Sequence, residues 1–563
     1  MLRAYWLPRI AVVSGLIGGL IGWGVNSASW TSSQAHAVEP HATEQPSTES
    51  SAESHAEVTF ATHVAKIMYD HCSSCHRPGQ AGPFSLLTYE DFRKHSETIL
   101  LVTKDRYMPP WKPVHVGIDF ANDRRLSDEE IELIATWVAA DCPEGPRDQM
   151  PQAPQFTDGW ALGKPDLIVK MPRPFNVPAD GKDLYRSFVL PVGLPEDKWI
   201  KAYELRPTAR NTVHHALFFI DETGSVRNQT ERDGQPGLKG MNFLRGIGGN
   251  FLERGPDRLA GGLGGYVPGA VPNPLPGDLA RFLPKGSDII MQTHFHPSGK
   301  PETEQAELGL YFADKPPSQR LVPIQLPPLF GMGAGLDIPA GEANFKIHGK
   351  YVLPIDVRGV EIGGHAHYIC RNMLMVAKLS NGASLELLKI DDWDLDWQDQ
   401  YQFAAPQVLP KGTELNVTIT YDNSAQNPEN PFSPPQQIAW GRESTDEMGS
   451  ITLQVVAADE SQRELLQEDL RKATRESLKK RIQTQSAGLA GLGGGALGGG
   501  AIGKGGLVKL LDRNRDGKLQ ELEVPERFRE RLFDFLDSNG DGELDSEELA
   551  AGRRSLDGIM DRN

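Results

Sequence analysis

The spacing of hydrophobic residues divides the chain into regions of different structure. Residues 58–147 carry apolar positions at helical spacing, whereas residues 160–456 carry short alternating or β-branched runs between Gly and Pro turns. Residues 457–506 are a charged stretch followed by a Gly-rich one, and residues 507–560 contain two acidic loops. The pattern predicts a helical segment, a long antiparallel β region, a helix with a flexible linker, and a second helical segment.

Two local patterns support the first helical segment. Val64, Ile67 and Met68 fall on one face of a predicted helix over 62–70. Ser127-Asp128-Glu129-Glu130 has the spacing of a capping box at the start of a second helix. In the β region, by contrast, runs such as 187–190, 216–220 and 451–456 are typical of antiparallel sandwiches.

The N-terminus has the pattern of an export signal. Arg3 and Arg9 flank the start of an apolar run of 16 residues from Ile10 to Val25, which is short for a membrane-spanning helix of roughly 20 residues. We expect residues 1–37 to be a cleaved signal, with a retained membrane anchor as the alternative, and residues 38–57 to be a disordered tether. Either reading places the protein outside the cytoplasm, in the periplasm or attached to the outer face of the membrane.

Composition narrows the function classes. The formal charge is −17, from 58 basic and 75 acidic residues, and no long basic stretch indicates a nucleic-acid partner. The chain is too long for one hydrophobic core, so several domains are expected. Only four cysteines occur, which excludes a disulfide-stapled scaffold. Cys142 and Cys370 could pair with each other, and Cys72 and Cys75 have another use.

That use is haem attachment. Cys72-Ser73-Ser74-Cys75-His76 has the C-x-x-C-H pattern, in which two thiols bond the porphyrin and the adjacent imidazole binds iron. A thioredoxin-like pair would need a βαβ setting, and a zinc site would need a second ligand pair nearby. With a helix on each side, the motif resembles the small class I cytochrome c fold. We therefore expect residues 58–147 to be an all-α cytochrome c domain.

A methionine is the expected second ligand of the haem iron, because a thioether suits electron transfer. Met108, within Tyr107-Met108-Pro109-Pro110-Trp111, is the candidate, and His115 is the alternative. The other nearby histidines, His63, His71 and His95, are expected on the surface or in packing.

Histidines cluster within the β region. His214-His215, His294-Phe295-His296 and His365-Ala366-His367 are three close pairs within 154 residues, of only 15 histidines in the chain. Chance explains this poorly. Because side chains alternate along a strand, a His-x-His sequence puts both imidazoles on one face, where they can hold one ion.

The order of these motifs resembles the copper type II, ascorbate-dependent monooxygenases, which include the peptidylglycine and dopamine monooxygenases. The resemblance is carried by Val213-His214-His215, by Met291 to His296, by Gly363 to His367 and by Ser444-Thr445-Asp446-Glu447-Met448. It implies two all-β jelly-roll copper domains, at 160–310 and 311–456.

The resemblance also implies the ligands of two coppers. His214, His215 and His294 would bind the electron-transfer copper, and His365, His367 and Met448 the oxygen-activating copper. A thioether favours Cu(I), the state that meets O2. His296 is then left outside the ligand set, and His348 has no role. The family's animal members are rich in disulfides, whereas this region has one cysteine, Cys370.

Two loops near the C-terminus fit the calcium-binding template of an EF-hand, which takes ligands at positions one, three, five, seven and twelve and glycine at six. We expect residues 507–560 to be an all-α EF-hand pair with a structural or docking role. The expected ligands are Asp512, Asn514, Asp516, Lys518 and Glu523 in the first loop, and Asp537, Asn539, Asp541, Glu543 and Glu548 in the second.

The combined prediction is a multidomain copper monooxygenase that uses O2 to hydroxylate a small organic substrate. The fused haem would relay electrons from an ascorbate-like reductant or a respiratory-chain partner, and the catalytic residues would be His365, His367 and Met448. Two alternatives stay open. A non-catalytic electron-transfer or copper-binding protein would not need His365, His367 or Met448, and a zinc hydrolase would need neither Met448 nor haem.

Overall fold

Antiparallel strands form most of the protein. The computed structural model describes residues 57–78, 80, 82–156, 159–181, 183–222, 224–229, 233–240, 263–269, 272–441, 443–492, 514, 516–520, 523–524, 533, 537 and 541–548, with side chains to residue 479 in the last long helix. Every strand pair in these ranges is antiparallel, as the sequence predicts.

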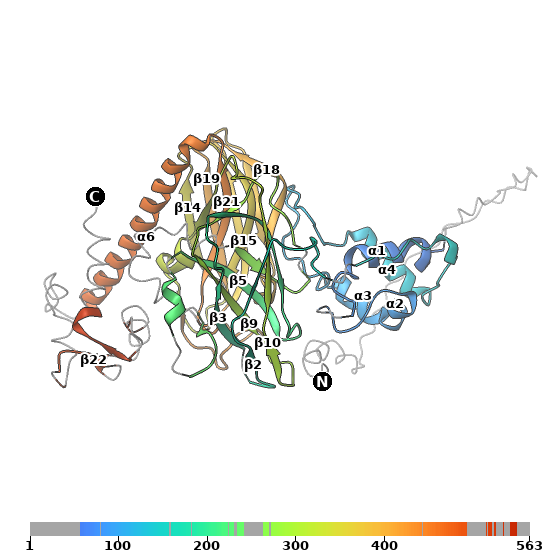
Figure 1. The fold of residues 1–563 in the computed structure, drawn as a ribbon, viewed down its shortest axis with the longest axis horizontal. Coiled ribbons are helices and arrows are strands. Elements are labelled where there is room, and N and C mark those ends of the chain that lie inside the picture. Colours follow the sequence, from blue (N-terminus) through green and yellow to red (C-terminus); the bar gives the residue numbers. More distant parts are fainter. Residues whose placement is uncertain are drawn as a thin grey trace, which may run out of the picture. The chain divides into compact units, whose positions relative to one another are not determined.

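The first helical segment follows its sequence pattern. Its helices are η1 (Phe60–Val64), α1 (Ala65–His71), α2 (Tyr89–Lys94), α3 (Ser96–Lys104), α4 (Asp128–Ala139) and η2 (Arg147–Gln149), and α1 to α4 are drawn in blue in Figure 1. The helix predicted over 62–70 is confirmed by η1 and α1. Before α4, Ser127 and Glu130 exchange both hydrogen bonds of the predicted capping box. The rings of Phe60, Phe92 and Trp137 lie 5.6 to 6.0 Å apart and form the centre of a small core.

The first β region is built from two sheets that share one core. The five-stranded sheet has the order β6-β3-β9-β5-β7 and the four-stranded sheet the order β1-β11-β4-β8. Leu190 and Phe218 from one sheet and Ile200 and Leu310 from the other are buried in the same cluster. The strands are β1 (Leu167–Lys170), β2 (Phe175–Val177), β3 (Leu184–Pro191), β4 (Lys198–Arg206), β5 (Val213–Asp221), β6 (Leu238–Lys239), β7 (Gly264–Tyr266), β8 (Arg281–Leu283), β9 (Asp288–Phe295), β10 (Glu302–Glu304) and β11 (Glu307–Phe312), and η3 covers Ser225–Asn228.

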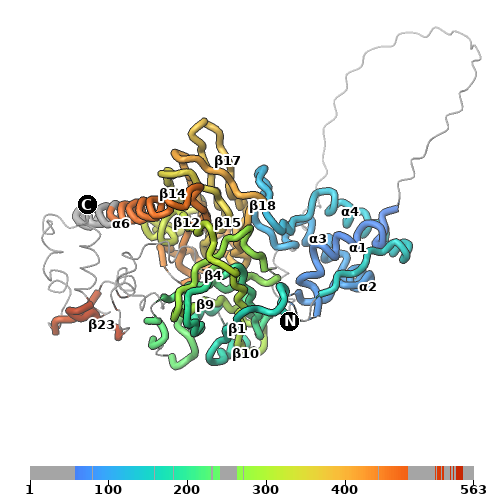
Figure 2. Tube along the Cα trace, turned by 45° about the horizontal axis from the view of Figure 1, so that its top comes forward, coloured from blue at the N-terminus to red at the C-terminus, as the bar shows by residue number. Residues whose placement is uncertain are grey.

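The second β region repeats this arrangement. Its sheets have the orders β12-β21-β15-β18 and β14-β19-β16-β17, and strict alternation buries Leu415, Val417, Ile419 and Tyr421 on one face of β19. Figure 2 shows its yellow and orange strands as a group beside the green strands of the first region. The elements are β12 (Leu321–Leu326), η6 (Leu329–Ala334), β13 (Asp337–Ile338), β14 (Phe345–Val352), β15 (Val357–Ala366), β16 (Cys370–Lys378), β17 (Ser384–Ile390), η7 (Leu395–Trp397), β18 (Gln400–Leu409), β19 (Glu414–Tyr421), β20 (Ile438–Ala439) and β21 (Gly449–Ala457).

The predicted fold class, a string of separate domains with an all-α cytochrome c domain and two jelly-rolls, is wrong. The described residues from Val58 onward belong to one compact, mostly β unit. The loop between α3 and α4 leaves the helices and joins the second β region, where Pro113 bridges Ile390 and Phe120 bridges Phe403. Apolar contacts also join the two β regions. Because cores cross the expected boundaries, neither the helices nor each sandwich stands as a domain of its own.

The C-terminal helix is also part of this unit. After η8 (Glu460–Gln462), α6 (Arg463–Leu492) confirms the predicted helix and runs into the segment that was expected to be linker. Its Leu466 and Leu470 are buried in the core of the second β region, and Asp469 accepts a 2.9 Å hydrogen bond from the Tyr351 hydroxyl. The helix is therefore packed along one side and not simply solvated.

The described part of the acidic C-terminal loops differs from the expected all-α pair. Their described part contains a two-stranded sheet, in which β22 (Leu519–Gln520) pairs with β23 (Glu543–Leu544). The expected export signal (1–37), the expected tether (38–57) apart from its last residue, and most of the Gly-rich linker lie outside the described residues. Within the described ranges, no helix combines the length and apolar character needed to cross a bilayer.

Candidate metal centres

A β-bulge brings three of the predicted ligands together. Adjacent residues in a regular strand point to opposite faces. The register between β5 and β9 shifts at Val213, so that His215 pairs with His294 and His214 becomes the extra residue. The rings of His214 and His215 lie with their centroids 5.2 and 4.9 Å from that of His294. The bulge explains how two neighbouring histidines can face one partner.

Two carboxylates orient this group, and the sequence analysis did not identify either. Asp396 Oδ1 lies 2.7 Å from His214 Nδ1, and the two oxygens of Asp183 lie 2.8 Å from His294 Nε2 and His296 Nδ1. Burial alone would lower the pKa of His214, but the hydrogen bond and charge of Asp396 outweigh it and raise that pKa. Ligand atoms of His214, His294 and Asp396 lie within 4.8 Å of one another, close enough to hold one metal ion.

The second predicted group sits where β15 ends. The rings of His365 and His367 have centroids 5.4 Å apart, so they occupy the same face of the strand, as the His-x-His spacing predicts. Burial lowers the pKa of His365 to about 4, and burial together with the charge of His365 lowers that of His367 to about 3. Both rings are neutral at pH 7, which is the form that binds metal.

The pairing of strands β15 and β21 places Met448 next to the His365 and His367 segment. β21 pairs with β15 at Gly449 and Ala366, and the preceding Glu447 carboxyl accepts backbone hydrogen bonds from His367, Ile369 and Met448. The Met448 side chain is buried in an apolar cluster against which Phe330 packs, and the Phe330 ring is 5.1 Å from that of His365. Met448 and His365 therefore share a partly buried neighbour, Phe330.

One glutamine links the two histidine groups. Gln398 Oε1 lies 2.7 Å from His365 Nδ1, and its Nε2 lies 3.4 Å from His215 Nε2. The side chain is buried and also donates to the Leu395 carbonyl oxygen. Because His215 comes from the first β region and His365 from the second, this contact places the two groups at the same boundary.

Three ring nitrogens in this boundary are buried and have no hydrogen-bond partner: His215 Nδ1, His294 Nδ1 and His365 Nε2. A buried polar atom without a partner costs about 1–3 kcal/mol, so such atoms are rare unless something else satisfies them. Metal ions bound to the two histidine groups would satisfy all three. Imidazole nitrogens with a thioether nearby suit copper, so the residues fit the predicted ion.

The C-x-x-C-H motif forms a closed turn after α1. The backbone N–H groups of Cys75 and His76 both donate to the Cys72 carbonyl oxygen. The Phe84 carbonyl oxygen lies 3.2 Å from His76 Nδ1, which leaves Nε2 as the nitrogen for an iron ligand. All four cysteines are free thiols, and Cys142 and Cys370 are buried in different cores. The turn fits haem attachment.

The axial role of Met108 stays a prediction. Met108 is half-buried after α3, and its backbone N–H donates to Val102. His115, the alternative, is more exposed and lies near Arg125. The histidines expected to be structural have neighbours of that kind: His95 stacks on Phe84 at 3.9 Å, and His71 contacts Arg124 and Glu130. His348 is exposed on β14, where it contacts Thr418.

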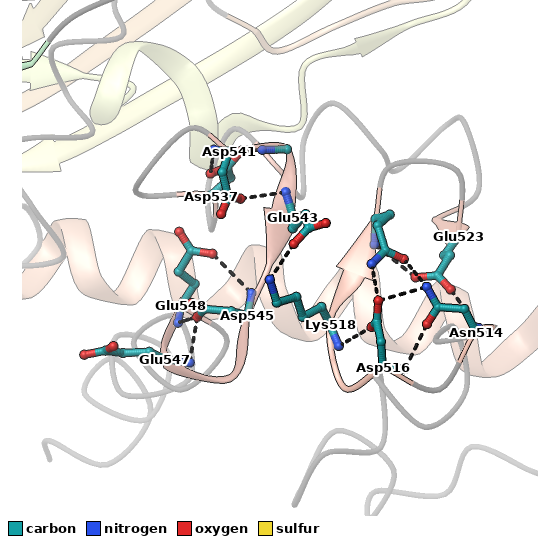
Figure 3. Close-up of polar contacts among 12 residues, drawn as sticks. Asn514, Asp516, Lys518, Glu523, Asp537, Asp541, Glu543, Asp545, Glu547 and Glu548 are labelled. Carbon is teal, nitrogen blue, oxygen red and sulfur yellow. Dashed lines mark hydrogen bonds and ion pairs between the residues drawn. The ribbon is translucent and has the colours of Figure 1, made fainter.

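The second acidic loop gathers its predicted ligands, as Figure 3 shows. Carboxylate oxygens of Asp537, Asp541 and Glu548 lie within 4.8 Å of one another. Asp537 also accepts backbone hydrogen bonds from Asp541 and Gly542, and Gly542 has a φ of +76°, which the tight turn requires. Glu543 extends its side chain to Lys518 of the first loop, at 2.5 Å. Asn539 lies outside the described residues.

The first loop has a similar frame. Glu523 accepts backbone hydrogen bonds from Asn514 at 3.1 Å and from Gln520 at 3.0 Å, and Gly517 has a φ of +85°. Asp516 accepts from the Lys518 backbone at 2.9 Å. Asp512 lies outside the described residues.

Comparison with known proteins supports the calcium assignment. The EF-hand family matches residues 528–551, which contain the second loop. No curated protein matches the chain. Among solved structures, PNGF-II shares 11% identity over 52% of this chain and 65% of its own, just under two thirds, with a TM-score of 0.22. The major capsid protein P2 of bacteriophage PM2 shares 8% identity over 52% of this chain and 97% of its own, with a TM-score of 0.18. Peptide-N(4)-(N-acetyl-β-D-glucosaminyl)asparagine amidase shares 10% identity over 52% of this chain and 96% of its own, with a TM-score of 0.19. Likeness at this level carries no functional argument.

We expect the Glu548→Gln variant to bind calcium on the order of tenfold more weakly, because Glu at position twelve supplies a bidentate charged ligand. Calcium titration by calorimetry on the full chain measures this. Glu547→Gln is the matched control, since the neighbouring Glu547 side chain is exposed and its position supplies no ligand. Equal weakening in both variants would mean that overall charge, and not the loop, sets the affinity.

Proposed function

We propose that this chain is an extracytoplasmic copper monooxygenase that hydroxylates a small organic substrate with O2 and receives electrons through a c-type haem. One observation carries the proposal. Five histidines from three distant stretches of chain meet at one buried boundary, and three of their ring nitrogens have no other partner. The electron source would be an ascorbate-like reductant or a respiratory-chain partner.

The histidine groups divide the roles between two ions. His214, His215 and His294 would hold one copper, and His365, His367 and Met448 the other. Copper in such sites supplies one-electron redox chemistry and activates O2 towards a C–H bond, and a thioether ligand favours the Cu(I) state.

The rest of the chain orients these ligands. Asp396 and Asp183 fix the ring positions of His214 and His294, as carboxylates beside ligating histidines commonly do. Gln398 accepts from His365 Nδ1 and so leaves the Nε2 lone pair free. The Glu447 carboxyl accepts backbone hydrogen bonds from His367 and Met448, and so fixes the backbone at both residues. Burial keeps bulk water from the His365 and His367 rings.

The helical segment would supply electrons. Cys72 and Cys75 would bond the haem, His76 would be one axial ligand, and Met108 the other, which suits an electron carrier. The EF-hand region would bind calcium in a structural or docking role, since affinities of about 10⁻⁴ to 10⁻³ M suffice outside the cytoplasm.

A second candidate, a zinc hydrolase, is favoured by one specific contact. His214, His294 and Asp396 together form a two-histidine, one-carboxylate set of the kind that catalytic zinc uses. This candidate gives no role to the unpartnered nitrogen of His365 or to the C-x-x-C-H turn.

Metal content and oxygen uptake of the purified, exported protein test the proposal. Two coppers and one haem per chain, with O2 uptake that an added substrate stimulates after reduction, are expected. Zinc in place of copper would redirect the assignment to hydrolysis. Copper and haem without substrate-stimulated uptake, across a panel of organic substrates, would favour the electron carrier.

The Met448→Ala variant separates the enzyme from the electron carrier. It should lose about 100-fold or more in O2 uptake, because it removes a ligand of the oxygen-activating copper but none of the other site, and loss of a residue that only orients a ligand already costs about 10- to 100-fold. The matched control is Met375→Ala, a fully buried methionine in the core of the second β region. Full uptake by Met448→Ala would rule out the proposed ligand.

A further inference from the structure

Arg124 connects the haem-attachment turn to both loops that lead to the histidine cluster. Its guanidinium donates to the Gly269 carbonyl oxygen at 3.3 Å and to Asp399 Oδ2 at 2.8 Å, and lies 5.7 Å from the centre of the Trp111 ring. Its backbone carbonyl oxygen lies 3.2 Å from Nδ1 of His71, the residue before Cys72. One residue therefore contacts three segments that are far apart in sequence.

The first loop leads from the Cys75 sulfur to the cluster. Gly269 lies directly against Cys75: a Cβ at Gly269 would come within 2.0 Å of the Cys75 sulfur. Three residues earlier, Tyr266 of β7 pairs with Ala216, which follows His215 in β5. The backbone of a single strand pair thus separates the haem-attachment turn from a predicted metal ligand.

The second loop reaches the cluster from the other β region. Asp399 follows Gln398, whose side chain contacts both His215 and His365, and Asp396 of the same loop contacts His214. The ion pair is well shielded, with Arg124 and Asp399 side chains 17% and 24% exposed. A shielded, hydrogen-bonded guanidinium of this kind fixes the positions of its partners, because each of them loses a hydrogen bond if it moves.

We propose that Arg124 is a positioning residue that docks the Cys72–His76 turn onto the Gly269 and Asp399 loops, and so sets the rate at which electrons pass from haem to the histidine cluster. The electron-transfer half of this inference rests on the proposed function, whereas the docking half does not. With both groups bound, one electron would leave ferrous haem, which would become ferric, and would reduce one Cu(II) to Cu(I). The rate of electron transfer falls steeply with distance, so it decreases when the contact between the turn and the two loops loosens.

The test compares Arg124→Gln with Arg125→Gln in the full chain loaded with haem and copper. Arg125 is the matched control, because the contacts of its guanidinium among the described residues are to Asp123 and His115 of the helical segment's own loop. Haem is reduced in the presence of oxidised copper, and its reoxidation is followed by absorbance in a stopped-flow instrument. Hydrogen exchange of residues 264–269 and 395–400 is measured on the same proteins.

Arg124→Gln should slow haem reoxidation on the order of 10-fold and speed exchange in both loops, while Arg125→Gln matches the wild type. Direct reduction of copper by excess ascorbate should be unchanged in both variants. Arg124→Lys, which keeps the charge but not the two-pronged contact, should be intermediate.

Three results would overturn the inference or part of it. Wild-type rates and exchange in Arg124→Gln would overturn it entirely. Faster exchange throughout that variant, with a lower melting temperature, would mean that Arg124 supports the fold in general and not the dock. Wild-type haem that stays reduced beside oxidised copper would overturn the proposed relay and the electron-transfer half, and the exchange comparison would then decide the docking half.

Discussion

Replacing His365 with alanine is expected to lower substrate-stimulated O2 uptake by more than ~100-fold and to leave about one copper per chain. Loss of a residue that merely orients a metal ligand typically costs 10- to 100-fold in affinity or activity, so loss of a ligand costs more. The variant removes the buried Nε2 that has no protein partner, and it also frees Gln398 Oε1 from its 2.7 Å contact. Copper analysis and an oxygen electrode measure the two effects.

His348→Ala is the control for this experiment. His348 belongs to the same β region but is exposed on β14, so its replacement should change neither copper content nor uptake. Thermal unfolding of both variants separates lost chemistry from lost fold. If His365→Ala kept two coppers and full uptake while folding normally, His365 would not be a ligand and the assignment of the oxygen-activating site would fail.

The second large effect concerns the haem. A Cys72→Ala, Cys75→Ala double variant should carry no covalently bound haem, because the C-x-x-C-H motif holds the porphyrin through those two sulfurs. Haem staining after denaturing electrophoresis should fall from one haem per chain to none. Uptake driven by a protein electron donor should stop, whereas uptake driven by excess ascorbate should continue, since a small reductant can reach copper directly.

Cys142→Ala provides the matched cysteine control, because Cys142 is a buried free thiol in the same helical segment. It should keep its haem and its response to both donors. Retention of covalent haem by the double variant would show that the turn at Cys72–His76 is not the attachment site. Loss of ascorbate-driven uptake as well would mean that haem is needed for more than electron supply.

The local features of the fold could be predicted from sequence, because they depend on neighbours in the chain. The capping box at Ser127 and the alternation in the β region are set by residues a few positions apart, and both are present in the structure. The close approach of His365 and His367 follows from the same alternation. These features need no knowledge of the tertiary fold.

The separation into domains could not be predicted in this way. Helical spacing in residues 58–147 indicated an independent all-α unit, but Ile118 and Phe120 of that segment are buried in the core of the second β region. Two apolar residues in a loop give no periodic pattern, so nothing in the sequence indicates which core they join. In this chain a change of secondary structure therefore does not mark a domain boundary.

The same limit explains the missed site residues. Asp183 lies 111 positions from His294, and Asp396 lies 182 positions from His214, so only the folded chain shows that each carboxylate meets an imidazole. Gln398 is still less visible, because a glutamine in an acidic stretch carries no metal-binding pattern. An exposed turn would be the ordinary reading of the run from Asp391 to Gln400.

Because His214 is an extra residue in strand β5, the histidine cluster depends on the β-bulge at this position. With ordinary pleating at this point, adjacent side chains would point to opposite faces, and the imidazoles of His214 and His215 would diverge from a common partner instead of converging on it. The adjacent pair His214-His215 is thus a more specific sequence signal for this centre than either His-x-His pair, because any exposed strand can carry a His-x-His pair. A search for related sequences should weigh that dipeptide and its place before a hydrophobic strand above overall similarity.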